Sequence, residues 1–140
     1  MKPHIYNENI KICWGEFMEL GVSKEEYLES VYVLGIKHGK VVRNVDLAHV
    51  LNVKKSSASQ AIQTLIDMEY LYRGEDYELL LTSKGMELGE RIYQRHQFWS
   101  RYLQYIGVDS KTAAKDAREM QHVLSDESFL KLKEHVMKEK

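Results

Sequence analysis

Apolar residues recur at helical spacing along most of the chain. The stripes predict helices over residues 5–20, 23–34, 45–51, 56–68, 83–105, 110–124 and 126–138. Pro3 is the only proline, so little in the sequence interrupts these helices. Two short apolar runs, Leu71–Tyr72 and Tyr77–Leu81, flank a turn at Gly74–Asp76 and predict a β-hairpin. The pattern therefore predicts a mainly α fold with one hairpin.

The two shorter helices have the pattern of a helix-turn-helix. Ala48 is small enough for two helices to cross closely near the turn at residues 52–55. The inward stripe of the second helix consists of Ala58, Ala61, Ile62 and Leu65. A helix-turn-helix followed by a hairpin is the order of a winged-helix domain, the fold class that we expect here.

The outer face of the second helix is short, polar and free of carboxylates. No acidic residue occurs between Asp46 and Asp67, although the chain has 21 of them. Lysines at the helix entrance suit phosphates, and Ser and Gln side chains can hydrogen-bond base edges in a major groove. The alternative is a helical hairpin whose polar face meets only water. The predicted DNA-contacting residues are Lys54, Lys55, Ser56, Ser57, Ser59, Gln60, Gln63, Thr64 and, in the wing, Arg73.

The long helix carries a coiled-coil-like seam. Its members recur at spacings of four, three, four and three, which is typical of a stripe that buries against a partner helix: Ile92, His96, Trp99, Leu103 and Ile106. We expect this seam to belong to a subunit interface, or to the layer between a DNA-binding region and a dimerisation region. A lone histidine on such an apolar face is more often a core residue than a ligand.

Three polar residues, Arg118, Gln121 and His122, share one face of the next helix at i, i+3 and i+4. Helices use this spacing to hold metal ions. Arginine, however, is a permanent cation without a lone pair, and an amide is a weaker ligand than a carboxylate. The spacing is therefore typical of a metal site, whereas Arg118 and Gln121 are poor metal ligands.

Composition narrows the class of protein. The net charge is −1 and 44% of the residues are hydrophobic, close to ordinary globular usage. The single cysteine, Cys13, excludes an internal disulfide. No apolar run approaches the roughly 20 residues of a membrane span, and the N-terminus lacks a signal-peptide core. No nucleophile elbow, phosphate loop or strong zinc motif is present. We therefore expect a soluble cytoplasmic protein that is not an enzyme and has no membrane partner.

Several phrases of the sequence resemble one family. "EEYLESVYVL", "VRNVDLAHVLNVKKSSASQAI", "LLLTSKG", "IYQRHQFWSRYLQYIGVD" and "DAREMQHVLSDESF" are similar to the diphtheria-toxin-repressor family of metal-dependent transcriptional repressors. The chain most resembles its short branch, which includes manganese-responsive regulators and lacks an SH3-like domain. The resemblance covers residues 23 to about 136. It implies a homodimeric repressor of double-stranded operator DNA, with a winged-helix domain (23–84) and a helical metal-site and dimerisation domain (85–140). Residues 1–22 fall outside the resemblance, and we expect them to form a helical N-terminal extension.

The resemblance also implies a metal site between the two domains. Its ligand positions fall on Glu26 and Glu29 in the first family helix, on His96 in the long helix and on His122. A second carboxylate that the iron-responsive branch uses falls on Ser100. The four retained side chains could hold Mn²⁺ or Fe²⁺, with Zn²⁺ as a substitute.

Two ligand positions are altered. Where the family offers a cysteine or glutamate and then a glutamate, this chain has Arg118 and Gln121. Either Arg118 swings away from a bound ion, or its guanidinium takes the place of the ion and pairs with Glu26 or Glu29. We expect a regulator that is weakly metal-responsive or needs no metal. The alternatives are a true Mn²⁺- or Fe²⁺-responsive repressor, and a dimeric interaction protein that has lost DNA binding.

Overall fold

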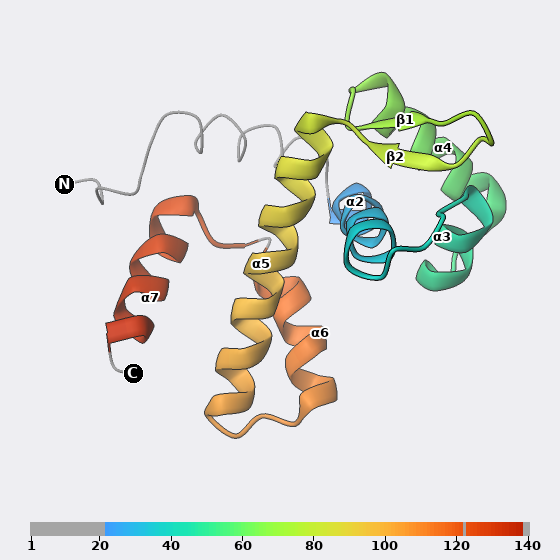
Figure 1. Cartoon of the computed structure of the whole chain (residues 1–140). Coiled ribbons are helices and arrows are strands. Elements are labelled where there is room, and N and C mark those ends of the chain that lie inside the picture. Colours follow the sequence, from blue (N-terminus) through green and yellow to red (C-terminus); the bar gives the residue numbers. More distant parts are fainter. Residues whose placement is uncertain (1–21, 122, 139–140) are drawn as a thin grey trace. The chain divides into compact units, whose positions relative to one another are not determined.

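The computed structural model describes residues 22–121 and 123–138, and Figure 1 shows their helices and the one hairpin. The mainly α fold class is thereby confirmed; the predicted helix over residues 5–20 lies outside the described residues. The elements are α2 (Val22–Tyr32), which continues as the π-helical turn η1 (Val33–Lys37), α3 (Asn44–Leu51), α4 (Lys55–Asp67), β1 (Leu71–Arg73), β2 (Leu79–Leu81), α5 (Ser83–Tyr105), α6 (Ser110–Met120) and α7 (Asp126–Lys138). None of the described helices is long and apolar enough to cross a bilayer.

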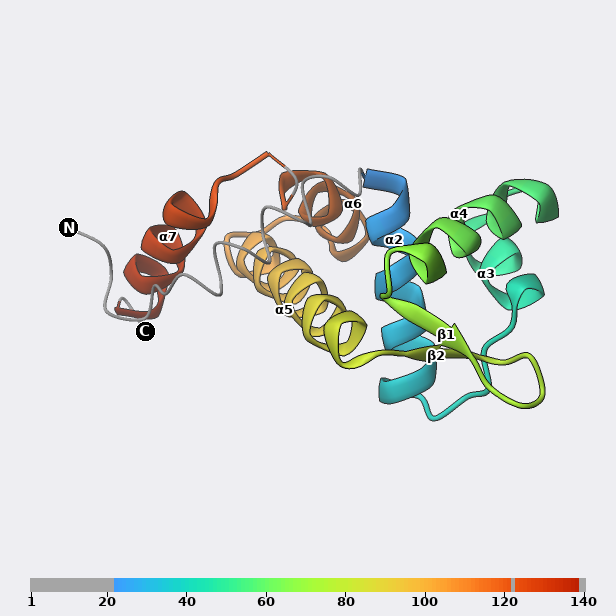
Figure 2. The same ribbon diagram turned by 90° about the horizontal axis from the view of Figure 1, so that it is seen from above.

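The chain divides into two compact units, one formed by residues 20–93 and one that includes residues 94–140, so α5 contributes to both. In the first unit α2 packs against α3 and α4, with the hairpin beside them (Figure 2). The inward stripes meet in an apolar core whose most buried members are Leu28, Leu47, Ile62, Leu65 and Leu71. Ala48 and Ala58 are also buried, in accord with close approach of α3 and α4.

The hairpin is short, and its second strand is hydrogen-bonded on both edges. β1 and β2 are antiparallel, with Leu71 opposite Leu81 and Arg73 opposite Leu79. On the other edge of β2, the Leu79 N–H donates to the Val42 carbonyl over 2.7 Å, so the segment before α3 acts as a third strand-like partner. The second strand begins two residues later than predicted, because Tyr77 adopts the left-handed region (φ 62°) and belongs to the turn.

Thr82 joins the hairpin to α5. Its hydroxyl donates to the Glu69 carbonyl over 2.6 Å and accepts from the Gly85 N–H over 2.9 Å, which makes Thr82 the N-cap. A methyl group at Gly85 would overlap the Tyr70 carbonyl oxygen, so only glycine allows the start of α5 to lie this close to the chain after α4.

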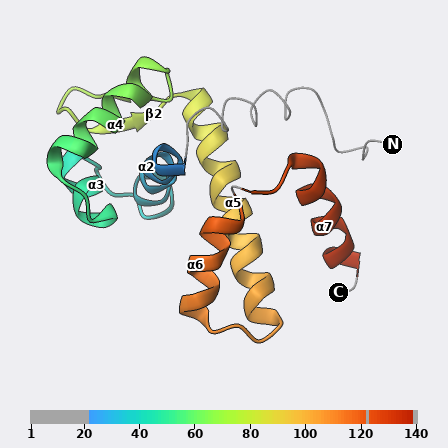
Figure 3. The same cartoon turned by 180° about the vertical axis from the view of Figure 1, so that it is seen from behind.

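The described part of the second unit contains the last part of α5 together with α6 and α7. α6 runs back along α5 (Figures 1 and 3) and begins at Asp109, whose carboxylate accepts from Lys111 and Thr112 N–H groups. The core is aromatic: Trp99, Ala117 and Phe129 are buried together, with Phe98 and Tyr102 against them. The predicted seam is thus partly used inside the chain, since Ile92 and Trp99 are buried while Ile106 is 57% exposed.

The helix after the 107–109 turn ends earlier than predicted, at Met120 instead of residue 124. The Val123 N–H bonds back to the Met120 carbonyl, and Ser125 then caps α7 through the Ser128 N–H. Two caps so close together leave no room for another helical turn. Gln121 therefore occupies the C-cap of α6 instead of its interior.

Candidate DNA-reading surface and metal site

The outer face of α4 is polar and open to solvent. Its inward stripe is fully buried at Ala58, Ile62 and Leu65. The exposed side consists of Lys55, Ser56, Ser57, Ser59, Gln60 and Gln63, preceded by exposed Lys54, whereas Thr64 is half-buried. The amphipathic pattern thus places most of the predicted DNA-contacting residues of the helix on one surface.

Two of these side chains have partners within the helix. The Gln63 Nε2 group donates to Asp67 Oδ1 over 3.0 Å, and the Thr64 hydroxyl donates to the Gln60 carbonyl over 3.0 Å. The Thr64 proton is therefore committed to the backbone. Gln63 keeps its amide oxygen as an acceptor and the second N–H of its amide as a donor, so it can still bond a base edge.

The side chain of Arg73, at the end of β1, makes hydrogen bonds within the protein. Its guanidinium donates to the Tyr77 carbonyl over 3.1 Å and to Asn44 Oδ1 over 3.1 Å. Asn44, the first residue of α3, in turn donates from Nδ2 to the Ser59 hydroxyl over 3.4 Å. We did not single out Asn44 in the sequence, because an asparagine at a helix start is also a common cap residue.

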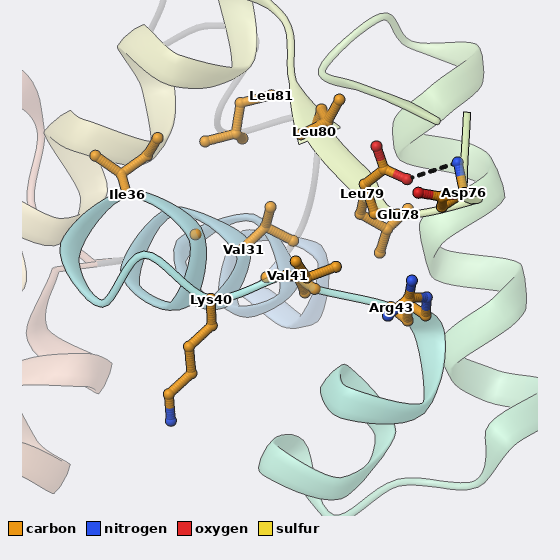
Figure 4. A pocket seen from close by; sticks show the side chains of 12 residues that line it. Val31, Ile36, Lys40, Val41, Arg43, Asp76, Glu78, Leu79, Leu80 and Leu81 are labelled. Atoms are coloured by element: carbon orange, nitrogen blue, oxygen red, sulfur yellow. Dashed lines mark hydrogen bonds between the residues drawn. The ribbon is translucent and has the colours of Figure 1, made fainter. Parts of the chain in front are cut away.

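The tip of the wing is acidic, with Glu75, Asp76 and Glu78 close together, and the Asp76 N–H donates to Glu78 over 2.9 Å. Beside the wing lies a hollow of about 320 Å³, which Figure 4 shows from nearby. Apolar residues of α2, η1, β2 and the segment before α3 line most of it, with Lys40 and Arg43 among its charged lining residues. No α4 residue lines this hollow, so it is separate from the polar face.

The carboxylates predicted as metal ligands lie on α2. Glu26 is half-buried and Glu29 is buried, with 9% exposure. Tyr27 lies between them in the sequence and is only 4% exposed. Burial is the main cause that raises the pKa of Tyr27 above the ordinary 10.0, and the negative charge of Glu26 is the second. The i, i+3 spacing places both carboxylates on one side of the helix.

The remaining candidate ligands lie in the second unit. The half-buried His96 has its Nε2 atom 3.3 Å from the Ala114 carbonyl of α6. If Nε2 carries the proton and donates, Nδ1 has the lone pair that a metal needs, which is a common arrangement for ligating histidines. His122 lies outside the described residues.

The two altered positions differ sharply in burial. Arg118 is exposed, while Gln121 is 1% exposed, and neither polar atom of its amide has a hydrogen-bond partner among the described residues. Within the described part of the chain no three His, Cys, Asp or Glu side chains gather as metal ligands would. A buried amide without partners is costly unless something binds it. Gln121 thus offers a neutral amide oxygen where the resemblance implies a carboxylate, which is the stronger ligand for a divalent cation.

Arg95, next to His96, is a buried cation that we did not assign a role from the sequence. Only 2% of it is exposed, and it donates to the Leu124 carbonyl over 2.7 Å. It also lies 3.7 Å from Asp126 and stacks on Phe129, 4.5 Å from the ring centre. Arg95 thereby ties α5 to the turn after α6 and to the start of α7.

Comparisons with known proteins agree with this geometry. Residues 19–77 match the family description "Iron dependent repressor, N-terminal DNA binding domain". Residues 82–139 match "Iron dependent repressor, metal binding and dimerisation domain". Together the two descriptions span most of the chain.

Individual relatives point the same way. The chain is 37% identical over 103 residues to the HTH-type transcriptional regulator MntR of Bacillus velezensis, covering 74% of this chain and 72% of the relative. It is 31% identical over 112 residues to the uncharacterized HTH-type transcriptional regulator MJ0568 of Methanocaldococcus jannaschii, covering 79% and 90%.

Solved structures share the fold. The manganese regulator SloR matches with a TM-score of 0.72 at 22% identity, and the metal-dependent transcriptional regulator MtsR with 0.73 at 23%. Each match covers 81% of this chain but only 53% of the solved one, so the chain spans about half the length of those structures. On the two domain matches and the identity to MntR, this chain belongs to the iron-dependent repressor family of transcriptional regulators.

Proposed function

We propose that this DNA-binding regulator reads its operator through the exposed face of α4. The observation that carries the proposal is a solvent-facing row of uncharged polar side chains in a helix-turn-helix, with Lys54 and Lys55 at its entrance. Lysines neutralise phosphates, whereas Ser and Gln distinguish bases. Gln60 and Gln63 are assigned to base edges, and Ser57 and Ser59 to a base or a phosphate.

The regulator acts as a homodimer in the cytoplasm, where its DNA target lies. The match of residues 82–139 to a dimerisation domain supports the dimer. Two copies of α4 related by a twofold axis bind half-sites separated by one helical turn, about 34–36 Å, or by a multiple of it.

The response to metal is weaker than the family's usual ligands would give. A cation held by Glu26, Glu29, His96 and His122 lacks the anionic ligands that the resemblance places at residues 118 and 121. Since divalent cations favour charged oxygen or sulfur ligands, the substitutions lower the affinity. The candidate ion is Mn²⁺ or Fe²⁺, with Zn²⁺ as a substitute.

Calorimetric titration of the metal-stripped protein with Mn²⁺, anaerobic Fe²⁺ and Zn²⁺ tests this proposal, with duplex binding measured at several salt concentrations. We expect weak saturable binding and a modest gain in DNA affinity. Tight binding with a large gain in DNA affinity would contradict the weakened site. Absence of salt-dependent duplex binding, with or without metal, would contradict the DNA-reading role and favour an interaction protein.

Restoring the missing charge gives a second test. Arg118→Cys combined with Gln121→Glu removes a cation and adds anionic ligands, so Mn²⁺ or Fe²⁺ affinity should rise at least about tenfold, about 1.4 kcal/mol. Lys111→Cys, which removes an exposed cation from the other end of α6, is the matched control and should leave metal affinity unchanged. No gain from the double variant would mean that these positions do not belong to a metal site.

A further inference from the structure

A chain of hydrogen bonds connects the wing to the exposed face of α4. It runs from the Arg73 guanidinium to Asn44 Oδ1 over 3.1 Å, and from Asn44 Nδ2 to the Ser59 hydroxyl oxygen over 3.4 Å. The other end of the guanidinium is fixed to the Tyr77 carbonyl of the wing turn. The first strand, the start of α3 and the middle of α4 are therefore joined through three side chains.

The direction of this chain is fixed by chemistry. A guanidinium can only donate, so the oxygen of the Asn44 amide must face Arg73. The amide nitrogen then faces Ser59, whose hydroxyl oxygen accepts. The single hydroxyl proton of Ser59 remains, and it has no acceptor within the described part of the chain. Because the first donor is charged, it also polarises the bonds that follow it.

We propose that Arg73, Asn44 and Ser59 form a one-way relay that makes Ser59 a hydrogen-bond donor toward DNA, with Arg73 and Asn44 as positioning residues for specificity. This inference rests on the proposed reading of DNA by α4. The acceptor has the chemistry of a base edge in the major groove, such as a purine N7, a guanine O6 or a thymine O4. Cytosine offers only its amino donor there, so it is disfavoured at the contacted position.

The relay competes with a simpler role for Arg73, a phosphate contact made by a basic residue of the wing. The two roles predict different consequences when charge and geometry are separated. Arg73→Lys keeps the charge but cannot bond the Tyr77 carbonyl and Asn44 in the fixed fork of a guanidinium. Asn44→Asp keeps the size and the bond to Arg73 but presents an acceptor to Ser59, so the hydroxyl proton must turn away from DNA.

The experiment selects duplexes with the wild-type protein from a pool randomised in sequence, and then measures affinity for the selected duplex and its single-base variants. The proteins are wild type, Ser59→Ala, Asn44→Asp, Arg73→Lys and the double variant Asn44→Asp with Ser59→Ala. Arg101→Gln, which alters an exposed arginine of the second unit, is the control. Circular dichroism and a melting curve establish that each variant is folded.

We expect Ser59→Ala to reduce discrimination at one base position about fivefold, the effect of one hydrogen bond. Asn44→Asp and Arg73→Lys should relax the same position, and Ser59→Ala should add nothing in the Asn44→Asp background. The slope of affinity against salt should stay the same for Arg73→Lys, because the charge is kept.

Two results would overturn the relay while leaving DNA reading by α4 intact. One is that Ser59→Ala relaxes a position whose preference survives in Asn44→Asp and Arg73→Lys. The other is that Ser59→Ala changes no base preference at all. If the wild-type protein itself selects no sequence, the proposed reading by α4 fails first, and the relay fails with it; this outcome is seen before any variant is made.

Discussion

Replacing Arg95 by methionine tests whether one buried cation holds the second unit together. The change keeps a long flexible side chain of similar reach but removes the guanidinium that bonds the Leu124 carbonyl and faces Asp126. Because Arg95 is 2% exposed and the Asp126 side chain 12%, water cannot take over these contacts easily. Both partners lie at or just before the start of α7, so we expect that helix to loosen first.

The expected loss of folding stability follows from the contacts that Arg95 makes. A hydrogen bond from a charged donor contributes about 1.5–3 kcal/mol, and stacking of a desolvated cation on an aromatic ring about 2 kcal/mol. Against this, methionine avoids the cost of burying a charge, which is why apolar replacements of whole buried ion pairs are often neutral. Here only one partner is removed and the Asp126 carboxylate stays, so we expect a net loss of about 3 kcal/mol.

Urea unfolding measures this loss of stability. The protein concentration is held fixed, because association of subunits makes the unfolding midpoint depend on concentration. Arg101→Met removes an exposed arginine from the same helix and should change stability by less than about 0.5 kcal/mol. Adding Asp126→Asn to Arg95→Met should recover part of the loss, because the remaining carboxylate becomes neutral. An Arg95→Met protein as stable as wild type would refute this reasoning.

Three further outcomes are expected. Gly85→Ala forces a methyl group onto the Tyr70 carbonyl and should cost about 1–3 kcal/mol in thermal unfolding; an unchanged melting temperature would contradict the close contact. Gln63→Ala should weaken discrimination between bases more than overall affinity, and an equal loss across all sequences would reduce Gln63 to a backbone contact. Tyr27 has a raised pKa in the folded protein, so its stabilising effect is present at neutral pH and is lost as pH rises above 10 through that pKa. Tyr27→Phe should therefore resist alkaline unfolding better than wild type, as circular dichroism against pH would show.

The helix-turn-helix could be predicted from the sequence because its signals are local. Inward residues at helical spacing and small residues at the crossing define α3 and α4, and the structure shifts their starts by one residue only. The wing was predicted for the same reason, apart from the positive φ of Tyr77. Local preferences decide such elements, so a single sequence contains most of what is needed.

The contacts around Arg73 and Arg95 could not be predicted in this way. Arg73 meets Asn44 across 29 residues of sequence, and Arg95 meets Leu124 across the same interval. Spacing along one helix says nothing about such pairs, which depend on how elements pack. The ligand positions, likewise, came from resemblance and not from periodicity, and the burial of Gln121 beside the exposure of Arg118 became visible only in the folded chain.

The proposed weakening of the metal site and the proposed relay together limit how this regulator can be switched. Driving a protein from mostly inactive to mostly active takes a ligand that binds the active state roughly 10⁴-fold more tightly. The weak metal site that we propose makes such a difference harder to reach. The DNA-binding unit must then start close to its active geometry. A wing tied to α3 and α4 through Arg73 and Asn44 provides such a geometry without metal. Metal would in that case adjust the spacing of two preformed reading helices in the dimer, instead of building the reading surface itself.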